Sequence, residues 1–126
     1  LLGVMGGSFS EGVDFYDGIL QAVVVVGLPL APPSKEVDVL IDYFERKAGE
    51  GKGETYAYLN PAITRVLQAA GRLIRREEDR GVVVLMDERL EQARYQRLLP
   101  PDFSPSALED AQDLGRTVQA FFEREA

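Results

Sequence analysis

The chain has 126 residues, of which 45% are hydrophobic and 28% charged, a composition typical of one globular domain with a real core. Cysteine and histidine are both absent, which excludes disulfides, thiol nucleophiles, imidazole bases and the usual zinc sites. The formal net charge of −7 argues against binding of nucleic acid by bulk electrostatics, so any DNA contact must be local.

The first half of the chain is predicted to contain two strands and a helix. The apolar residues 1–5 predict a short buried strand. Residues 21–26, QAVVVV, predict a second strand that is buried on both faces, since almost every residue is apolar. A proline-rich loop over residues 27–33 ends it. Ser34 is the expected N-cap of a helix that runs to about Ala48 with its apolar residues on one face.

The second half alternates helices with one further strand. Its predicted elements are a Gly- and Lys-rich loop over 50–55, a helix from Pro61 with Asn60 as N-cap, a strand over 81–86, a helix over 88–98 and a last helix from Ser106 to about residue 125. Strands that alternate with helices predict a parallel sheet with right-handed crossovers. The residues that end the third strand, Asp87 and Arg89, are expected to form a structural ion pair.

The segment from Gln68 to Arg75, QAAGRLIR, carries the strongest functional signal. At helical spacing, Gln68, Arg72 and Arg75 fall close to one face of the predicted helix. Guanidinium is always charged and its planar fork matches phosphate oxygens, so two converging arginines suit a phosphoryl group. Gly71 would let a phosphate or another backbone come close. By itself, the pattern is equally compatible with a surface helix that carries solvated arginines.

A second segment, residues 6–15 with the sequence GGSFSEGVDF, follows the first predicted strand. Open α/β sheets place ligands where a strand turns into such a loop, and glycines such as Gly7 allow close backbone approach. Ser8 and Ser10 offer hydroxyls and amides to a phosphate. Glu11 and Asp14 are acceptors that could orient a ribose hydroxyl, a water or a facing arginine. Taken alone, the segment fits an ordinary strand-to-loop turn.

Together the two segments resemble motifs V and VI of superfamily 2 helicases, above all those of the XPD/DinG-like branch of DNA helicases. In that branch motif V is similar to residues 6–15 and motif VI to residues 68–75. Motif VI is commonly followed there by a short charged turn, a glycine and a strand that ends Asp-x-Arg, as residues 75–89 are arranged here. The resemblance covers residues 3–90.

The resemblance implies a RecA-like α/β fold, with a parallel sheet and flanking helices. Residues 1–126 would form a single, partial C-terminal helicase domain of a longer enzyme, because the sequence contains neither a GxxxxGK[ST] phosphate loop nor a DEAH-type motif. ATP and Mg²⁺ would then be shared with an upstream RecA-like domain. The XPD branch carries an iron–sulfur cluster on cysteines, which could lie only elsewhere in such a protein; no metal site is expected in this segment.

The resemblance also implies roles for individual residues. Arg72 and Arg75 would be catalytic and would stabilise charge on the γ-phosphate of ATP. The remaining assignments are contact with the nucleotide for Gln68, Gly71, Glu11 and Asp14, and contact with single-stranded DNA for Gly7, Ser8 and Ser10.

The resemblance therefore implies the motor domain of an ATP-dependent DNA helicase that acts in DNA repair and couples hydrolysis to movement along single-stranded DNA. No membrane span is expected, since no run of about 18 apolar residues occurs, and the expected location is the cytoplasm, or the nucleus of a eukaryote. One alternative is a non-catalytic docking module for a regulatory partner of a DNA repair complex, bound through residues 98–122. The other is an unrelated α/β nucleotide-binding domain; a phosphate loop and DEAH motif upstream would exclude it.

Overall fold

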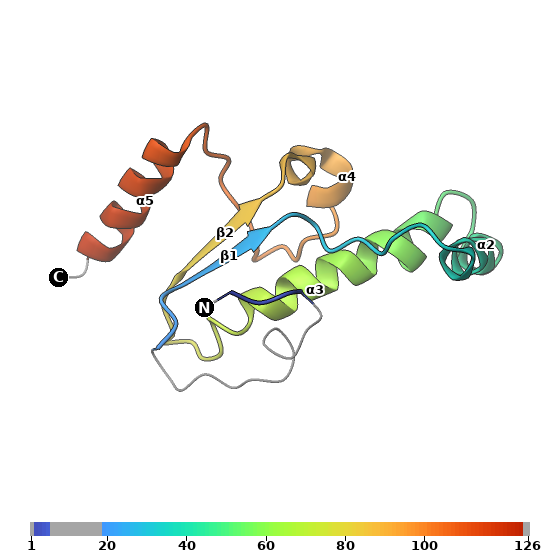
Figure 1. Cartoon of the computed structure of the whole chain (residues 1–126), viewed down its shortest axis with the longest axis horizontal. Helices are drawn as coiled ribbons and strands as arrows, with labels where there is room; N and C mark the ends of the chain where they lie inside the picture. The colour runs from blue at the N-terminus through green and yellow to red at the C-terminus, as the bar shows by residue number, and fades with distance from the viewer. Residues whose placement is uncertain (1, 6–18, 125–126) are drawn as a thin grey trace.

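The computed structural model describes residues 2–5 and 19–124. Its elements, in chain order, are β1 (Ala22–Val26), α2 (Lys35–Ala48), the π-helical η1 (Thr55–Leu59), α3 (Asn60–Ala70), β2 (Val82–Met86), the 3₁₀-helical η2 (Glu88–Glu91), α4 (Ala93–Gln96) and α5 (Ala111–Glu123) (Figure 1). No helix within these described ranges combines the length and the apolar character that crossing a membrane requires.

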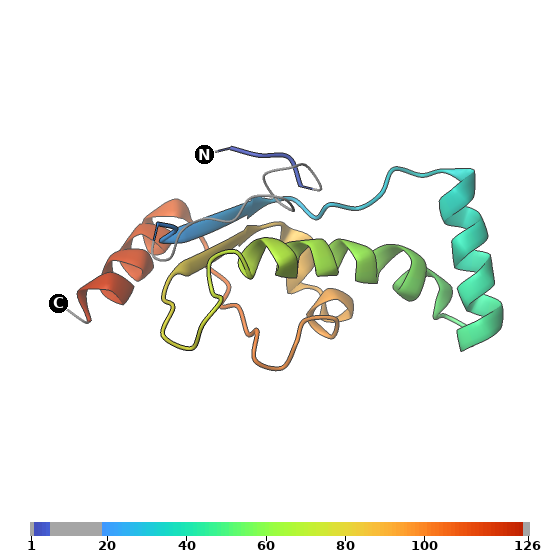
Figure 2. The same cartoon turned by 90° about the horizontal axis from the view of Figure 1, so that it is seen from below.

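The two strands form a parallel pair, in register from Ala22 opposite Val82 to Val26 opposite Met86. The crossover between them contains α2, η1 and α3, and α3 runs along one face of the sheet (Figure 2). Because α3 runs opposite to the strands, its last residues lead through residues 71–81 to the amino end of β2 (Figure 1). The predictions of strands over 21–26 and 81–86, and of parallel pairing, are confirmed.

The hydrophobic core lies where α3 meets β1 and the segments that follow β2. Its buried members are Val25, Leu28, Leu59, Ile63, Val66, Ala69, Leu90 and Tyr95. Val66, at the centre of α3, has no exposed surface at all. Complete burial of a side chain of this kind contributes about 1.5–3 kcal/mol, so α3 is held mainly by its apolar face.

The prediction that β1 is buried on both faces is wrong. Val25 is 4% exposed, whereas Val24 is 55% and Val26 75% exposed. Successive side chains of a strand point to opposite faces, and α3 covers only the face that carries Val25 (Figure 2). A run of apolar residues therefore did not distinguish a strand covered on one side from one covered on both.

Residues 2–5 do not form the predicted buried strand. Residues 2–4 have no regular secondary structure, and Leu2 is 96% exposed. Met5 packs against the core. A strand needs a neighbour that accepts and donates backbone hydrogen bonds, and in the described part of the chain β1 and β2 bond only to each other.

The long central helix begins before the predicted start at Pro61. Helical geometry starts at Gly53 and continues through η1 into α3, and Asn60 has helical angles, φ −58° and ψ −43°, instead of those of a cap. The Asn60 N–H donates to the carbonyl oxygen of Thr55, in the wider π-helical pattern. Proline lacks an N–H and its ring crowds the preceding turn; we attribute the wide turn before Pro61 to relief of that crowding.

The helix α2 begins as predicted and lies across the end of the central helix that points away from the sheet (Figures 1 and 2). The Ser34 hydroxyl accepts a hydrogen bond from the Val37 N–H at 3.3 Å, which confirms the N-cap. Phe44 stacks on Tyr56 with ring centroids 5.8 Å apart. The Glu45 carboxylate accepts the N–H groups of Gly51 and Gly53 at 2.5 and 2.6 Å, so this carboxylate ties the following loop to α2.

The C-terminal third differs from its prediction in two places. The expected helix over 88–98 is divided into η2 and α4, because Gln92 between them has extended angles, φ −74° and ψ 134°. The last helix begins at Ala111 instead of after Ser106. Asp110 is its N-cap and accepts the N–H groups of Gln112 and Asp113 at 2.7 and 2.8 Å; Asp and Ser are comparable N-caps, so composition did not decide between the two positions.

Candidate functional site

The predicted ligand-binding residues of the first motif lie outside the described residues. They are Gly7, Ser8, Ser10, Glu11 and Asp14, and their proposed roles stay predictions. The second motif is described in full and supplies the geometry of the candidate site.

The helix that carries the second motif ends earlier than the prediction requires. It ends at Ala70, and Gly71 closes it with its N–H donating to the carbonyl oxygen of Leu67 at 2.8 Å. The N–H groups of Arg72 and Leu73 then donate to carbonyls only three residues back, at 3.2 and 3.0 Å. The argument that Gln68, Arg72 and Arg75 share one helix face is therefore wrong. Glycine is a poor helix former, and the chain tightens as it leaves α3.

The second-motif residues lie along the last turn of α3 and the segment that follows it. Gln68 is exposed on the last turn, Arg72 is partly buried just past the end, and Arg75 is exposed three residues further on. A Cβ added at Gly71 would meet only carbonyl oxygens of its own helix, Leu67 at 3.3 Å and Gln68 at 3.6 Å. The outer side of Gly71 is thus open to approach among the described residues.

Residues 71–81, here called the arginine turn, are fixed at both ends. Leu73 is buried in the turn and contacts Gly81, where the turn meets β2. The Asp79 carboxylate accepts the N–H groups of both Arg75 and Arg76 at 2.8 Å, and the Asp79 N–H donates to the Arg76 carbonyl at 3.2 Å. The Arg75 N–H bond, followed by that of Arg76, lowers the pKa of the Asp79 carboxyl.

The sequence prediction missed Asp79, because it was based on the arginines and their helical spacing. A signal was present, since a short acidic side chain a few residues after a helix often bonds to nearby backbone N–H groups.

Substitution of Gly81 by alanine is expected to destabilise the fold by about 1–3 kcal/mol, the usual cost of overpacking. The added Cβ would lie 2.6 to 2.7 Å from three side-chain carbons of the buried Leu73, which would have to repack. Urea unfolding measures the change. The matched control is Gly115→Ala in α5, where an added Cβ meets nothing within 4 Å; it should be neutral or gain up to about 1 kcal/mol from helix propensity. Equal behaviour of the two variants would contradict the packing argument.

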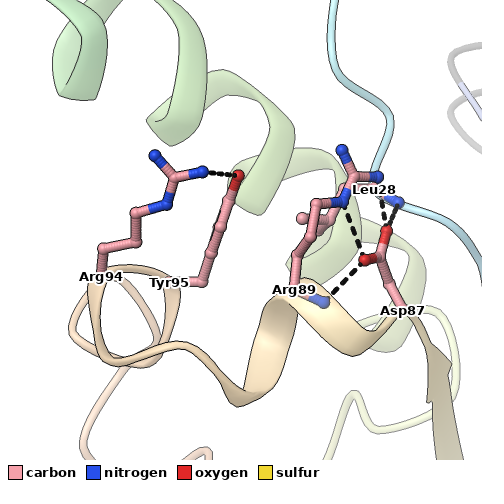
Figure 3. A network of polar contacts seen from close by, with 5 residues as sticks. All are labelled: Leu28, Asp87, Arg89, Arg94 and Tyr95. Carbon is pink, nitrogen blue, oxygen red and sulfur yellow. Dashed lines mark hydrogen bonds and ion pairs between the residues drawn. The ribbon is translucent and has the colours of Figure 1, made fainter.

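A second polar cluster lies where the two strands end (Figure 3). Asp87 follows β2, and its Oδ2 accepts the N–H of Leu28 at 2.7 Å and Nη2 of Arg89 at 2.6 Å. Its Oδ1 accepts the backbone N–H and Nε of Arg89 at 3.0 and 2.9 Å. Asp87 thereby joins the loop after β1 to the end of β2. The predicted pairing of Asp87 with Arg89 is confirmed.

The Asp87 pair should make stability depend on acid pH. Hydrogen bonding to Arg89 lowers the pKa of Asp87 from 3.8 to about 2, against the opposing effect of burial. A folded-state pKa below the unfolded value stabilises the fold above the unfolded pKa, and this contribution is lost as pH falls through the folded pKa. Between pH 4 and pH 2 the free energy of unfolding should fall by about 2 kcal/mol more in the wild type than in Asp87→Asn. Urea unfolding at several pH values measures this, and parallel profiles would contradict it.

The described residues offer no evident metal site. Within residues 2–5 and 19–124, no three His, Cys, Asp or Glu side chains come together in a way that could hold a metal ion. The candidate site carries guanidinium and amide groups, which suit phosphate oxygens.

Comparison with known proteins identifies the class to which this arrangement belongs. The family model described as the helicase C-terminal domain matches residues 1–106, a range that includes both motifs and both strands. The chain belongs to the helicase C-terminal domain family.

Individual relatives support the same assignment and confirm the resemblance to the XPD/DinG-like branch. The ATP-dependent DNA helicase chl1 of Schizosaccharomyces pombe is 34% identical over 123 residues, which cover 84% of this chain and 14% of that protein. The ATP-dependent DNA helicase DinG of Photobacterium profundum is 32% identical over 99 residues, 79% of this chain and 14% of that protein. The regulator of telomere elongation helicase 1 homolog of Caenorhabditis elegans is 38% identical over 101 residues, 75% of this chain and 10% of that protein. The chain thus spans a small part of each relative.

Proposed function

We propose that residues 1–126 are part of the second RecA-like domain of an ATP-dependent DNA helicase. In this proposal the chain presents Arg72 and Arg75 to ATP held by an upstream domain of a longer protein. The observation that carries it is the helicase C-terminal family match over residues 1–106, which includes a motif with two arginines close together at the end of one helix. Two relatives that are named ATP-dependent DNA helicases support ATP and DNA as the ligands.

The proposed chemistry is stabilisation of charge on a transferring phosphoryl group. Positioned guanidinium groups that face developing charge in a site that excludes water are among the strongest catalytic devices for this reaction. Arg75 is exposed on the arginine turn and Arg72 lies beside the end of α3, and these positions support the proposed contact with a facing domain. Gln68 and the open side of Gly71 would contact the nucleotide. Mg²⁺ would be held by the upstream domain, and no residue of this chain is assigned to it.

The proposed coupling to DNA depends on the first motif. Gly7, Ser8 and Ser10 would contact phosphates of single-stranded DNA through amides and hydroxyls, which carry no sequence information. Glu11 and Asp14 would face the nucleotide cleft, so that one loop connects the two ligands. Closing and opening of the cleft would then move one domain along the strand. A net charge of −7 is compatible with such local contacts.

The test is ATP hydrolysis and strand separation by a chain in which this domain follows its upstream domain, measured with and without single-stranded DNA. We expect turnover that DNA stimulates and that is lost when Arg75 is replaced. Turnover that is indifferent to DNA and to Arg75 would refute the proposal and favour an unrelated nucleotide-binding domain.

A further inference from the structure

The backbone at Arg75 is held by one side chain that no assigned function uses. The Asp79 carboxylate accepts two consecutive N–H groups, those of Arg75 and Arg76, both at 2.8 Å. Two bonds from adjacent peptide groups to one carboxylate fix the direction of the backbone as well as its position. The Asp79 N–H bond to the Arg76 carbonyl closes the same turn. The path of the chain is therefore defined at the residue whose guanidinium the proposed reaction requires.

The other side of the arginine turn is also anchored. Leu73 is buried and packs against Gly81, so Arg75 lies between a hydrophobic anchor and a carboxylate anchor. Arg75 is past the end of α3, and the helix itself no longer sets the direction of its side chain. Because the arginine side chain is long, a small rotation of the backbone at Arg75 moves its guanidinium by a large distance.

We propose that Asp79 is a positioning residue for Arg75, which sets the approach of its guanidinium to the γ-phosphate by holding the two backbone N–H groups. The inference rests on the proposed function, because it assumes that Arg75 acts on ATP. Asp79 itself touches neither ATP nor DNA in this proposal. The ordinary alternative is that Asp79 only stabilises a surface turn, in which case its loss lowers stability and leaves the catalytic rate of the folded enzyme unchanged.

Three substitutions of Asp79 in the longer helicase chain separate these roles. Asp79→Ala removes the acceptor and should lower kcat for DNA-stimulated ATP hydrolysis by about 10- to 100-fold, the loss that misplacement by about 1 Å can cause. Asp79→Glu keeps the charge and moves the acceptor, and should also lower kcat. Asp79→Asn keeps the reach and an acceptor oxygen, and should stay within about threefold of wild type. The KM for ATP should change by less than about threefold in all three, because Arg75 is proposed to act mainly on charge that develops in the transition state.

Two controls make the result specific to Arg75. Glu45→Ala also removes a carboxylate that accepts two backbone N–H groups, those of Gly51 and Gly53, but far from the arginine turn, and should leave kcat unchanged. The double variant Asp79→Ala with Arg75→Ala should be no slower than Arg75→Ala alone, because a residue that acts only through Arg75 has nothing further to lose. Thermal unfolding of each variant identifies any rate loss caused by unfolded protein.

The outcomes distinguish the two levels of the proposal. If Arg75→Ala keeps wild-type turnover, the proposed function fails. If Arg75→Ala is inactive while folded Asp79→Ala keeps wild-type kcat, only the positioning role is overturned. The same holds if the double variant is slower than Arg75→Ala by the full factor that Asp79→Ala causes alone. If Asp79→Ala does not fold, the Asn and Glu variants decide: equal kcat values for the two would contradict the geometric role.

Discussion

Replacement of Arg75 by alanine is expected to lower ATP turnover of the proposed helicase by ~10³- to 10⁵-fold, the range for arginines that contact a transferring phosphoryl group. The guanidinium would act most strongly as charge redistributes on the γ-phosphate, so the loss should fall on kcat more than on KM. DNA-stimulated ATP hydrolysis in the longer chain measures it. Arg75 is exposed and lies past the end of α3, so the fold and the affinity for DNA should stay near normal.

Arg75→Lys should restore little activity, because a point charge cannot reproduce the planar fork that bonds two phosphate oxygens. A surface arginine with no catalytic role contributes less than ~1 kcal/mol, which is far below the expected loss. Arg116→Ala is the matched control. Arg116 is an exposed arginine paired with Asp113 on α5, and its loss should not change turnover. If Arg75→Ala keeps at least about a third of wild-type turnover, the lost transition-state stabilisation is less than ~1 kcal/mol. The catalytic assignment would then be wrong.

Local patterns in the sequence predicted the structure correctly where a single physical signal decided it. The β-branched run of β1 and the apolar run of β2 formed strands, and their separation by helices led to parallel pairing. Ser34 capped α2 because a hydroxyl directly before an amphipathic helical run can accept an N–H group of the first turn. Asp87 and Arg89 paired because their two-residue separation at a strand end allows a fork of hydrogen bonds.

Prediction failed where local signals competed with packing over longer distances. Asn60 and Pro61 have the sequence of a helix start, but Leu59 is buried in the core, and the helix extends upstream to carry it there. Gly71 was treated as a position inside a helix, although its low helix propensity coincides with the end of α3. This error affected the predicted geometry of the candidate site most, since the position of Arg75 depends on where the helix ends.

The hydrogen bonds of Asp79 show why the rest of the site could not be predicted from periodicity. Its bonds to Arg75 and Arg76 exist only in the folded turn, and that turn depends on the contact of Leu73 with Gly81. Helical or strand spacing describes regular backbone, and residues 74–80 have none. The arginines were recognisable by type, whereas the carboxylate that bonds to the backbone of two of them was not.

Residues 1–126 by themselves are expected to show no ATP turnover above background, with or without single-stranded DNA. An arginine that stabilises charge on a phosphoryl group accelerates nothing unless other groups hold the β- and γ-phosphates and orient the attacking water. The sequence has no GxxxxGK[ST] loop to do this.

Phosphate release by the purified chain, compared with the same domain joined to its upstream domain, measures the difference. Arg75→Ala in the isolated chain is the control, because it shows whether any residual rate depends on this site. A residual rate that Arg75→Ala leaves unchanged does not depend on this site and therefore reflects contaminating hydrolase. DNA-stimulated turnover that disappears with Arg75 would instead mean that the chain contains a complete ATP site. The proposal that two domains share the ATP site would then be wrong, and residues 6–18 would become the candidates for phosphate binding.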